Sequence, residues 1–381
     1  MQYVVKASFN AKPRQRHKIE PGAGLDSRAY NGRLKQEQQV RRIIIIDWSM
    51  IGDLVMLSPA VDCIAENYPD AMISILGAPA SISVYKHHPR VSELLPYDRS
   101  KGDWDIGNFR AAARQLAERS FDLGFIFHNS LGSALMAKLG KVKRRVGYCH
   151  EMRDALLTDR LHTSDIPQHL IETKLDLLRQ FGLEPKSTSE IVHIDQGRAK
   201  RWLREKLGPN LGRSRPIVGI SLGATRNYKM WTGQGMEALI NKFPVNSVDL
   251  VFLGAPHERA LFEGVYSYNN TVVDLVGETT IEELTWVLDK LDLYIGPDSG
   301  PMHLATARQT PVVALFGATN PSVCGPYCYE KARIIRSEKI CSECDKTQGK
   351  NINACLHTID AAEVYDAAVE LLGKYAAHWK D

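Results

Sequence analysis

Hydrophobic and polar positions along the chain follow two patterns, short apolar runs and longer amphipathic runs. Apolar runs bounded by turn residues are typical of strands buried in a parallel sheet, and apolar residues spaced three or four apart are typical of helices. The predicted strands are 43–46, 72–76, 123–127, 145–147, 217–221, 248–253, 293–295 and 312–316. The predicted helices are 54–67, 109–119, 130–139, 169–181, 197–207, 233–242, 257–265, 280–290 and 301–307.

Strands that alternate with helices predict an α/β fold in which parallel sheets are joined by right-handed crossovers. The order predicts two Rossmann-like domains, residues 43–185 and residues 186–381, the second ending in a terminal helix. Pro185 and small polar residues at 183–189 indicate the start of the linker between them. A cleft between two such domains is the natural place for a ligand.

Residues 1–42 form a basic N-terminal extension before the first domain. This segment has ten Lys and Arg against three acidic residues, a net charge of +7, so the rest of the chain carries about −3 of the overall +4. Its prolines and glycines leave no convincing periodicity, which favours a solvated, partly disordered arm. A contact with an acidic membrane surface, with an acceptor or with another subunit is the alternative.

Composition is that of a water-soluble enzyme. The chain has 381 residues, 44% of them hydrophobic, which is enough for two cores. No apolar run approaches the ~18 residues of a membrane span. The N-terminus lacks the apolar stretch of a secretory signal, so we expect a cytoplasmic protein that a lipid or protein acceptor must approach, at most at the inner face of the inner membrane. We expect no nucleic acid as a partner, and oligomeric state is left open.

The segment 292–305 predicts a strand, a tight turn and a helix that begins near Pro301. Such a junction directs backbone N–H groups towards an anion, and Gly300 allows a ligand to approach the backbone closely. Ser299 adds a hydroxyl donor. A phosphate is therefore the expected ligand, although glycine-rich loops of this kind are also common in α/β proteins without one.

A second junction follows the four isoleucines at 43–46. Gly52 marks the turn, and Asp53 stands at the start of the next helix, where the helix dipole favours its ionised form. Asp53 is therefore either a helix cap or a base.

Three ordered motifs now indicate a family. They are Ile51-Gly52-Asp53, the segment from Gly223 to Trp231, and the turn from Asp298 to His303. Together the motifs resemble the ADP-heptose:lipopolysaccharide heptosyltransferases, glycosyltransferase family 9, over nearly all of the chain from residue 42. The resemblance implies the GT-B fold, with two Rossmann-like domains facing each other across a cleft, and it extends to the protein-modifying, autotransporter branch.

The resemblance also implies roles for particular residues. Asp53 would be the catalytic base, Lys229 would bind phosphate with Thr225 nearby, and Glu258 would bind the ribose. Solvated surface is the alternative for Lys229, and helix capping is the alternative for Glu258. The turn would form the remaining nucleotide-sugar site with Asp298, Ser299, Gly300, Pro301, Met302 and His303. Asp298 would stabilise the turn by accepting backbone hydrogen bonds, or would bind a ribose or sugar hydroxyl. His303 would donate a hydrogen bond to the diphosphate or be a buried structural histidine.

Two absences narrow the chemistry. No Gly-x-Gly-x-x-Gly fingerprint is present, which argues against a nicotinamide oxidoreductase. The Asp-x-Asp element with which GT-A transferases bind a divalent metal is not present in a suitable place, because Asp103-Trp-Asp105 lies in a loop unconnected to the nucleotide motifs. We therefore expect transfer without a catalytic metal or other cofactor.

Five of the seven cysteines lie within 32 positions, in the Cys-rich segment 324–357. Cys341, Cys344 and Cys355 have spacings that suit a tetrahedral ion, and the fourth ligand is Cys328, Cys324 or His357. Some members of the resembling family bind iron through such a cluster. The expectation is a structural zinc or iron ion, and reduced free thiols are the alternative.

The expected function is inverting transfer of a heptose from ADP-heptose to an acceptor hydroxyl. The acceptor would be the core oligosaccharide on lipid A or a serine of an exported protein. A nucleotide-sugar epimerase on the same fold and a non-catalytic binding protein are the alternatives. Asp53 and Lys229 occurring together argue against the binding protein.

Overall fold

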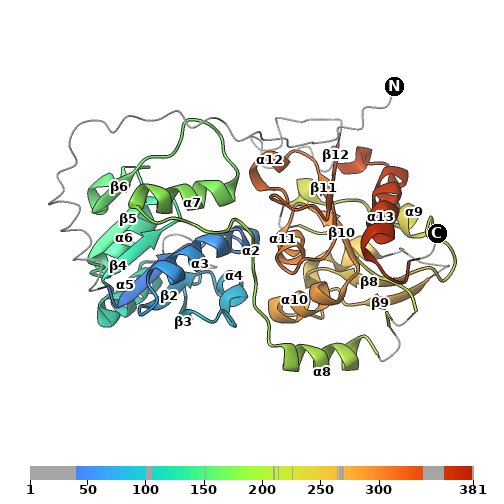
Figure 1. Ribbon diagram of the computed structural model, residues 1–381, viewed down its shortest axis with the longest axis horizontal. Helices are drawn as coiled ribbons and strands as arrows, with labels where there is room; N and C mark the ends of the chain where they lie inside the picture. The colour runs from blue at the N-terminus through green and yellow to red at the C-terminus, as the bar shows by residue number, and fades with distance from the viewer. Residues whose placement is uncertain are drawn as a thin grey trace. The chain divides into compact units, whose positions relative to one another are not determined.

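The computed structural model describes residues 40–99, 105–150, 152–208, 211–212, 214–224, 226–263, 265, 270–337 and 356–379. Within these ranges the chain forms two six-stranded sheets, ordered β3-β2-β1-β4-β5-β6 and β12-β11-β10-β7-β8-β9 (Figure 1). Each neighbouring pair of strands is parallel. Numbered within its own domain, each sheet has the order 3-2-1-4-5-6, which is the order of a dinucleotide-binding Rossmann fold.

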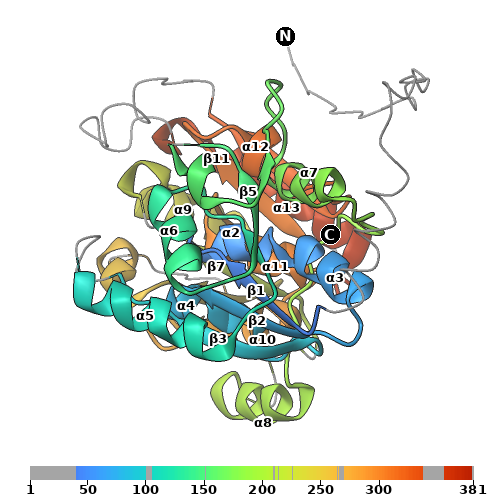
Figure 2. The same cartoon turned by 90° about the vertical axis from the view of Figure 1, so that its left-hand side faces the viewer.

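The first sheet consists of β1 Arg42–Ile46, β2 Met72–Gly77, β3 Val91–Pro96, β4 Leu123–Ile126, β5 Arg144–Tyr148 and β6 Asp159–Leu161. Its helices are α2 Ile51–Val55, α3 Ser58–Asn67, α4 Pro79–Ile82, α5 Ile106–Arg119, α6 Leu131–Leu139 and α7 Leu170–Phe181. Ile43 to Ile46 are fully buried, because β1 is a central strand covered on both faces. In Figure 2 this domain faces the viewer.

The second sheet consists of β7 Ile217–Ser221, β8 Asp249–Leu253, β9 Thr271–Asp274, β10 Leu293–Pro297, β11 Val312–Phe316 and β12 Ala332–Arg336. Its helices are α8 Gln196–Lys206, α9 Gly233–Ile240, α10 Ile281–Lys290, α11 Gly300–Ala307, α12 Pro321–Cys324 and α13 Ala361–Tyr375, with the 3-10 helices η3 Asn227–Lys229 and η4 Pro256–Phe262. The central strands β7, β8, β10 and β11 are buried throughout. The terminal helix α13 packs against α9.

The structure differs from the sequence prediction at the edges of both sheets. The strands β3, β6, β9 and β12 were not predicted, and they are the four outermost strands. Each is partly exposed, so its sequence lacks the continuous apolar run of a central strand.

The predicted helix 54–67 is two helices, α2 and α3. Pro59 has no N–H to donate to the carbonyl oxygen of Val55, and the hydroxyl of Ser58 donates to that oxygen instead, at 2.8 Å. The predicted helix 257–265 is also shorter and is the 3-10 helix η4.

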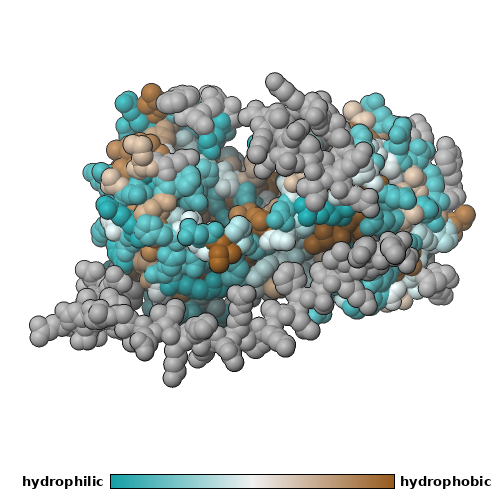
Figure 3. Space-filling view, turned by 90° about the horizontal axis from the view of Figure 1, so that it is seen from above, coloured by the Kyte–Doolittle hydropathy of each residue, from teal (hydrophilic) through white to brown (hydrophobic). Residues whose placement is uncertain are grey.

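None of the described helices is both long and apolar enough to cross a membrane. Seen from above in Figure 3, the surface of the described residues is mostly hydrophilic, and its hydrophobic side chains lie in small separate groups.

Candidate functional site

The N-termini of α2 and α11 meet between the two sheets. Both views show these helices side by side (Figures 1 and 2), and they contact each other. A Cβ atom on Gly52 would lie 2.8 Å from Cδ2 of His303, and one on Gly300 would lie 3.3 Å from Cβ of Ile51. The contact therefore depends on a glycine in each helix. It places the loops after β1 and β10 together, each at the strand-order reversal of its sheet, where ligands of open α/β sheets bind.

Asp53 is the third residue of α2 and is partly buried. The backbone N–H of Met50 interacts with its carboxylate, but no side-chain hydrogen bond caps α2 among the described residues. Burial raises the pKa of Asp53, and the charge of Asp47 adds to this, while Lys174 and His303 oppose it. A raised pKa brings a carboxylate closer to the neutral range in which a general base works best. The surroundings of Asp53 are therefore compatible with proton transfer.

Asp47 and Lys174 form a buried ion pair beside Asp53. Nζ of Lys174, on α7, lies 3.0 Å from Oδ2 of Asp47, which directly follows β1 and is 1% exposed. Burial alone would raise the pKa of Asp47, but Lys174 and hydrogen bonds from Ser49 outweigh it, and the pKa is lowered. The sequence analysis missed this pair. An acidic residue at the end of a buried strand was the only local signal.

His303, on α11, is 3% exposed and faces several carboxylates. Its Nδ1 lies 3.4 Å from Oε1 of Glu190, and its Nε2 lies 4.0 Å from Oδ1 of Asp298. Burial disfavours its charge, but Glu190, followed by Asp298 and Asp53, outweighs burial and raises the pKa of His303. The surroundings of the imidazole at the contact between α2 and α11 therefore favour its protonated form.

Lys229 and Asp298 form a second, partly buried ion pair. Their Nζ and Oδ2 atoms are 2.7 Å apart, and the thiol of Cys324 lies 3.7 Å from the same oxygen. Burial opposes the charge of Lys229, but Asp298 outweighs it, so the pKa of Lys229 is raised. An ammonium group has three donors, so a lysine that binds Asp298 still has two for a phosphate.

The rest of the predicted turn is mainly backbone. Ser299 precedes α11 without capping it, and its hydroxyl donates instead to the carbonyl of Pro297 at 3.2 Å. Pro301 stands in the first turn of α11, where no N–H is required. Met302 is fully buried, so only its backbone could contribute to a ligand cradle. Thr225 lies outside the described residues.

Glu258 lies against the loop that follows β7. Its carboxylate accepts a hydrogen bond from the backbone N–H of Ala255 at 2.7 Å, and a Cβ atom on Gly223 would overlap the carboxyl group. Glu258 therefore has the capping contact and is only 7% exposed. The ribose role remains a prediction.

An aromatic cluster lies at the carboxyl edge of the first sheet, and its residues Trp48 and Tyr97 are buried in the core. Trp48 follows β1, and its ring centroid is 5.1 Å from that of Tyr97 and 4.8 Å from that of His128. Burial lowers the pKa of His128 to about 4, so this imidazole is neutral at pH 7. Below it, the fully buried Arg153 donates to the carbonyls of Tyr148 and His128.

The predicted cysteine cluster lies largely outside the described residues, which exclude Cys341, Cys344 and Cys355. Of the candidates for the fourth ligand, Cys328 is exposed, and Cys324 lies beside Asp298. Burial, with the charge of Asp298, raises the pKa of Cys324 to about 12, so it is a thiol rather than a thiolate.

Among the described residues, Asp62, His88 and His193 are close enough to be considered as metal ligands. Nε2 of His88 lies 2.9 Å from Oδ1 of Asp62, and Nδ1 accepts a hydrogen bond from the backbone N–H of Arg90. In a neutral imidazole this arrangement requires the proton on Nε2, which is the nitrogen that faces the other ligands. The hydrogen bonds therefore favour a structural cluster over a metal site.

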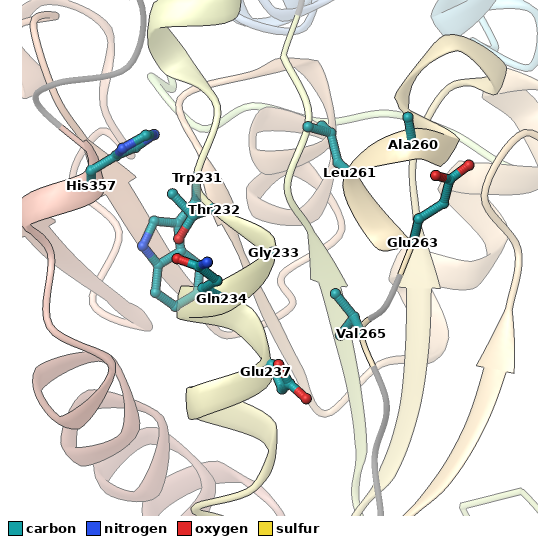
Figure 4. Close-up of a pocket in the computed structure, with 10 residues that line it drawn as sticks. All are labelled: Trp231, Thr232, Gly233, Gln234, Glu237, Ala260, Leu261, Glu263, Val265 and His357. Carbon is teal, nitrogen blue, oxygen red and sulfur yellow. The ribbon is translucent and has the colours of Figure 1, made fainter.

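A cavity of about 400 Å³ lies beside the N-terminus of α9 (Figure 4). Its lining residues are Trp231, Thr232, Gly233, Gln234, Glu237, Ala260, Leu261, Glu263, Val265 and His357. None of the charged residues at the contact between α2 and α11 belongs to this lining, so we do not assign the cavity to the same site. His357, the third candidate for the fourth metal ligand, lies on its wall.

Comparison with known proteins identifies relatives of the chain. The model of glycosyltransferase family 9 (heptosyltransferase) matches residues 109–354. Lipopolysaccharide heptosyltransferase 2 of Salmonella typhimurium is 25% identical over 310 residues, which cover 77% of this chain and 88% of that protein. The family that the sequence resembles is thereby confirmed.

Solved structures confirm the predicted GT-B fold. The family 9 glycosyl transferase of Veillonella parvula aligns with a TM-score of 0.75 at 20% identity, over 88% of this chain and 97% of that one. ADP-heptose lps heptosyltransferase II of E. coli aligns with a TM-score of 0.72 at 22% identity, over 88% and 100%. The iron-containing dodecameric glycosyltransferase TibC of enterotoxigenic E. coli has the same fold, with a TM-score of 0.53 at 14% identity over 88% and 76%.

Proposed function

The chain belongs to glycosyltransferase family 9 (heptosyltransferase), and from this premise we propose that it transfers a heptose from ADP-heptose to an acceptor hydroxyl with inversion at the anomeric carbon. The observation that carries the proposal is the contact between α2 and α11. It brings Asp53, a carboxylate with a raised pKa, to the buried His303, whose pKa is also raised, and His303 in turn faces Asp298, the partner of Lys229.

The second domain would hold the diphosphate of the donor. The first backbone N–H groups of α11 have no side-chain cap among the described residues, and a helix N-terminus attracts an anion. Lys229 and His303 add positive charge on the same side. Charge accumulates on the diphosphate as it leaves, so these donors would bind the transition state more tightly than the ground state.

The first domain would hold the acceptor. Asp53 would take the proton of the acceptor hydroxyl while the oxygen of that hydroxyl forms a bond to the anomeric carbon. The bond from that carbon to the diphosphate oxygen breaks at the same time, and its electron pair leaves with ADP. One displacement at one face of the sugar inverts the configuration, and Asp53 needs only to be a base.

Core oligosaccharide on lipid A is the acceptor we favour, because curated relatives such as the Salmonella protein are lipopolysaccharide heptosyltransferases. A serine hydroxyl of an exported protein is the second candidate. The cysteine-rich segment and the fold shared with the glycosyltransferase TibC support it more weakly.

The direct test is to incubate the protein with ADP-heptose and follow ADP release with a heptose-free core oligosaccharide, with an exported passenger protein, and with neither. The glycosidic product is then examined by NMR for its anomeric configuration. Transfer to the oligosaccharide with inversion supports the proposal. ADP release that needs no acceptor, isomerisation of the sugar alone, or retention of configuration would refute it.

We also propose that Cys341, Cys344 and Cys355 bind a structural zinc or iron ion. The support is the spacing of these thiols and the iron-containing neighbour TibC. Of the three candidates for a fourth ligand, we favour Cys328, which is exposed, because Cys324 already contacts Asp298 and His357 lines the cavity beside α9.

A further inference from the structure

Glu190 lies in the segment between α7 and α8 and is 8% exposed. The residues after it are bound to both domains. The backbone N–H of Ile191 donates to the hydroxyl of Ser58 in α3 at 2.9 Å, and the carbonyl of Val192 accepts from Nη1 of Arg308 at 2.6 Å. The position of Glu190 is therefore set by contacts on each side of the linker.

The two carboxylate oxygens of Glu190 have different partners on α11. Oε2 accepts a hydrogen bond from the hydroxyl of Thr306 at 2.6 Å, and Oε1 faces Nδ1 of His303 at 3.4 Å. Oε1 and Nδ1 are both buried, and neither has a hydrogen-bond partner among the described residues, so each is the nearest charge-pairing group for the other. A buried carboxylate is costly unless it is paired, and a positive charge on His303 would pair it.

Several other titratable groups act on His303. They are Asp53 from α2, Asp298 from the turn before α11 with its partner Lys229, and His169 at the start of α7, whose pKa is lowered by burial. Asp298 is already paired with Lys229, and Asp53 would lose its charge on accepting the acceptor proton. Glu190 is therefore the carboxylate best placed to pair with His303 throughout transfer.

The geometry also separates the two ring nitrogens of His303. Nδ1 faces Glu190, on the linker side, and Nε2 faces Asp298, on the side of the proposed diphosphate. A carboxylate at one nitrogen orients the ring and leaves the N–H of the other as a donor.

We propose that Glu190 is a positioning residue, which holds His303 as an imidazolium whose Nε2–H is directed at the departing diphosphate. This proposal rests on the proposed function for its catalytic consequence, but the state of His303 in the free protein does not depend on that function. Glu190 itself touches no reacting atom.

The first test is NMR titration of the histidine ring protons in the ligand-free protein, with His303 assigned by comparison with His303→Gln. We expect the pKa of His303 to lie above the ordinary value of about 6.5 in the wild type. It should fall by at least about one unit in Glu190→Gln, which is tenfold in the protonation equilibrium. Thr306→Val is the matched control, because it removes the other partner of the same carboxylate and leaves the charge, so the pKa of His303 should stay raised.

The second test is the pH profile of kcat/KM. The folded pKa of His303 is raised by Glu190, so the active imidazolium is lost as pH rises through that pKa, and Glu190→Gln should move the alkaline limb to lower pH. We expect a loss of about threefold or less at pH 6 and of up to about tenfold near pH 8.5, given a shift of about one unit. A purely structural defect would reduce the rate equally at all pH values.

A wild-type His303 that titrates below the ordinary pKa overturns the proposal without any variant. An unchanged titration in folded Glu190→Gln, or a rate loss independent of pH, overturns it as well. If the heptosyl transfer assay itself shows no activity, the NMR titration still decides the state of His303, and ADP binding measured by calorimetry at pH 6 and pH 8.5 replaces the rate. Glu190→Gln should then weaken ADP binding at pH 8.5 far more than at pH 6, and equal weakening at both would contradict the proposal.

Discussion

A carboxylate acts as a base near neutral pH when its surroundings raise its pKa without keeping it protonated. Influences of both signs act on Asp53, since burial and the charge of Asp47 raise its pKa, and Lys174 and His303 lower it. The sequence predicted Asp53 from its position beside Gly52 and from a family motif. It could not predict the opposing charges, because Lys174 and His303 are distant in the sequence and reach Asp53 only through the fold.

Asp53→Asn separates the two roles of this residue. An amide oxygen can still accept from the backbone N–H of Met50, so this local contact should persist, but the amide cannot take a proton from the acceptor. We therefore expect at least ~100-fold loss of kcat with little change in ADP affinity or melting temperature. Stopped-assay kinetics and calorimetry with ADP measure the two quantities. Near-normal turnover in this variant would show that Asp53 is not the base.

At the scale of helices and strands, the contact between α2 and α11 depends on the absence of a side chain. Gly52 is the second residue of α2 and follows an isoleucine, and Gly107 is the second residue of α5 and also follows an isoleucine. A Cβ atom on Gly52 would meet His303 at 2.8 Å, whereas one on Gly107 would have its nearest neighbour, Oδ1 of Asp105, at 3.4 Å. The two glycines are a matched pair that differ in what lies opposite.

Gly52→Ala should therefore separate α2 from α11, because His303 is buried against Glu190 and has little room to move. Overpacking of this kind costs about 1–3 kcal/mol of unfolding free energy, and activity should fall with it. Gly107→Ala should be within about 0.5 kcal/mol of the wild type, since alanine favours the helix. Urea unfolding and kcat/KM of both variants are the measurements. Equal effects at the two positions would show that the loss at Gly52 does not come from its contact with His303.

The first strand and α7 are joined by the ion pair of Asp47 and Lys174. Removing one partner of a buried pair leaves an uncompensated charge, so Lys174→Met should cost about 3–5 kcal/mol at pH 7. Lys143→Met is the control, because Lys143 pairs with Asp122 at 2.8 Å but is 69% exposed, and such surface pairs contribute about 1 kcal/mol or less.

The pH dependence of this pair has a definite sign. The pKa of Asp47 is lowered in the folded state, so its stabilisation is present above the unfolded pKa of about 3.9 and is lost as pH falls through the folded pKa. The difference between wild type and Lys174→Met should therefore shrink as the pH is lowered from 7 towards 3, measured by urea unfolding. A constant difference would mean that lost packing of the lysine stem, rather than charge, explains the variant.

Central and edge strands differed in how well the sequence predicted them. The buried strands β1, β7, β8 and β11 have continuous apolar runs and were found close to their observed bounds. The outermost strands are only partly covered, so their composition resembles that of loops. Pairing with a neighbour makes them strands, and pairing is a property of the sheet rather than of the local sequence.

At the scale of the whole molecule, the same strand order in both domains explains why the site could be predicted in outline. Each sheet reverses its strand order beside its first strand, and the motifs that the sequence indicated follow strands at these points. Glu190 could not be found this way. It lies between the domains in a run of small polar residues, and only the assembled fold brings it against His303.

A metal ion at the cysteine segment would affect the stability of the whole chain, because an ion that binds the folded state stabilises the protein by mass action. If Cys341, Cys344 and Cys355 bind a structural ion, protein purified without added metal should contain about one zinc or iron per chain by elemental analysis. Cys341→Ser should lose the ion and melt at a lower temperature, and chelation of the wild type should reproduce that shift. Cys149→Ser, which changes a cysteine directly after β5, should keep the ion.

The same variants can separate the metal from catalysis. The charged groups proposed to bind the diphosphate lie on the η3 loop and α11, outside the segment that carries these three thiols. Folded Cys341→Ser should therefore still bind ADP, with an affinity close to that of the wild type by calorimetry. Metal-free wild-type protein of unchanged stability would refute the structural ion, and would leave these cysteines as reduced thiols. Loss of ADP binding together with the metal would instead connect the segment to the nucleotide site.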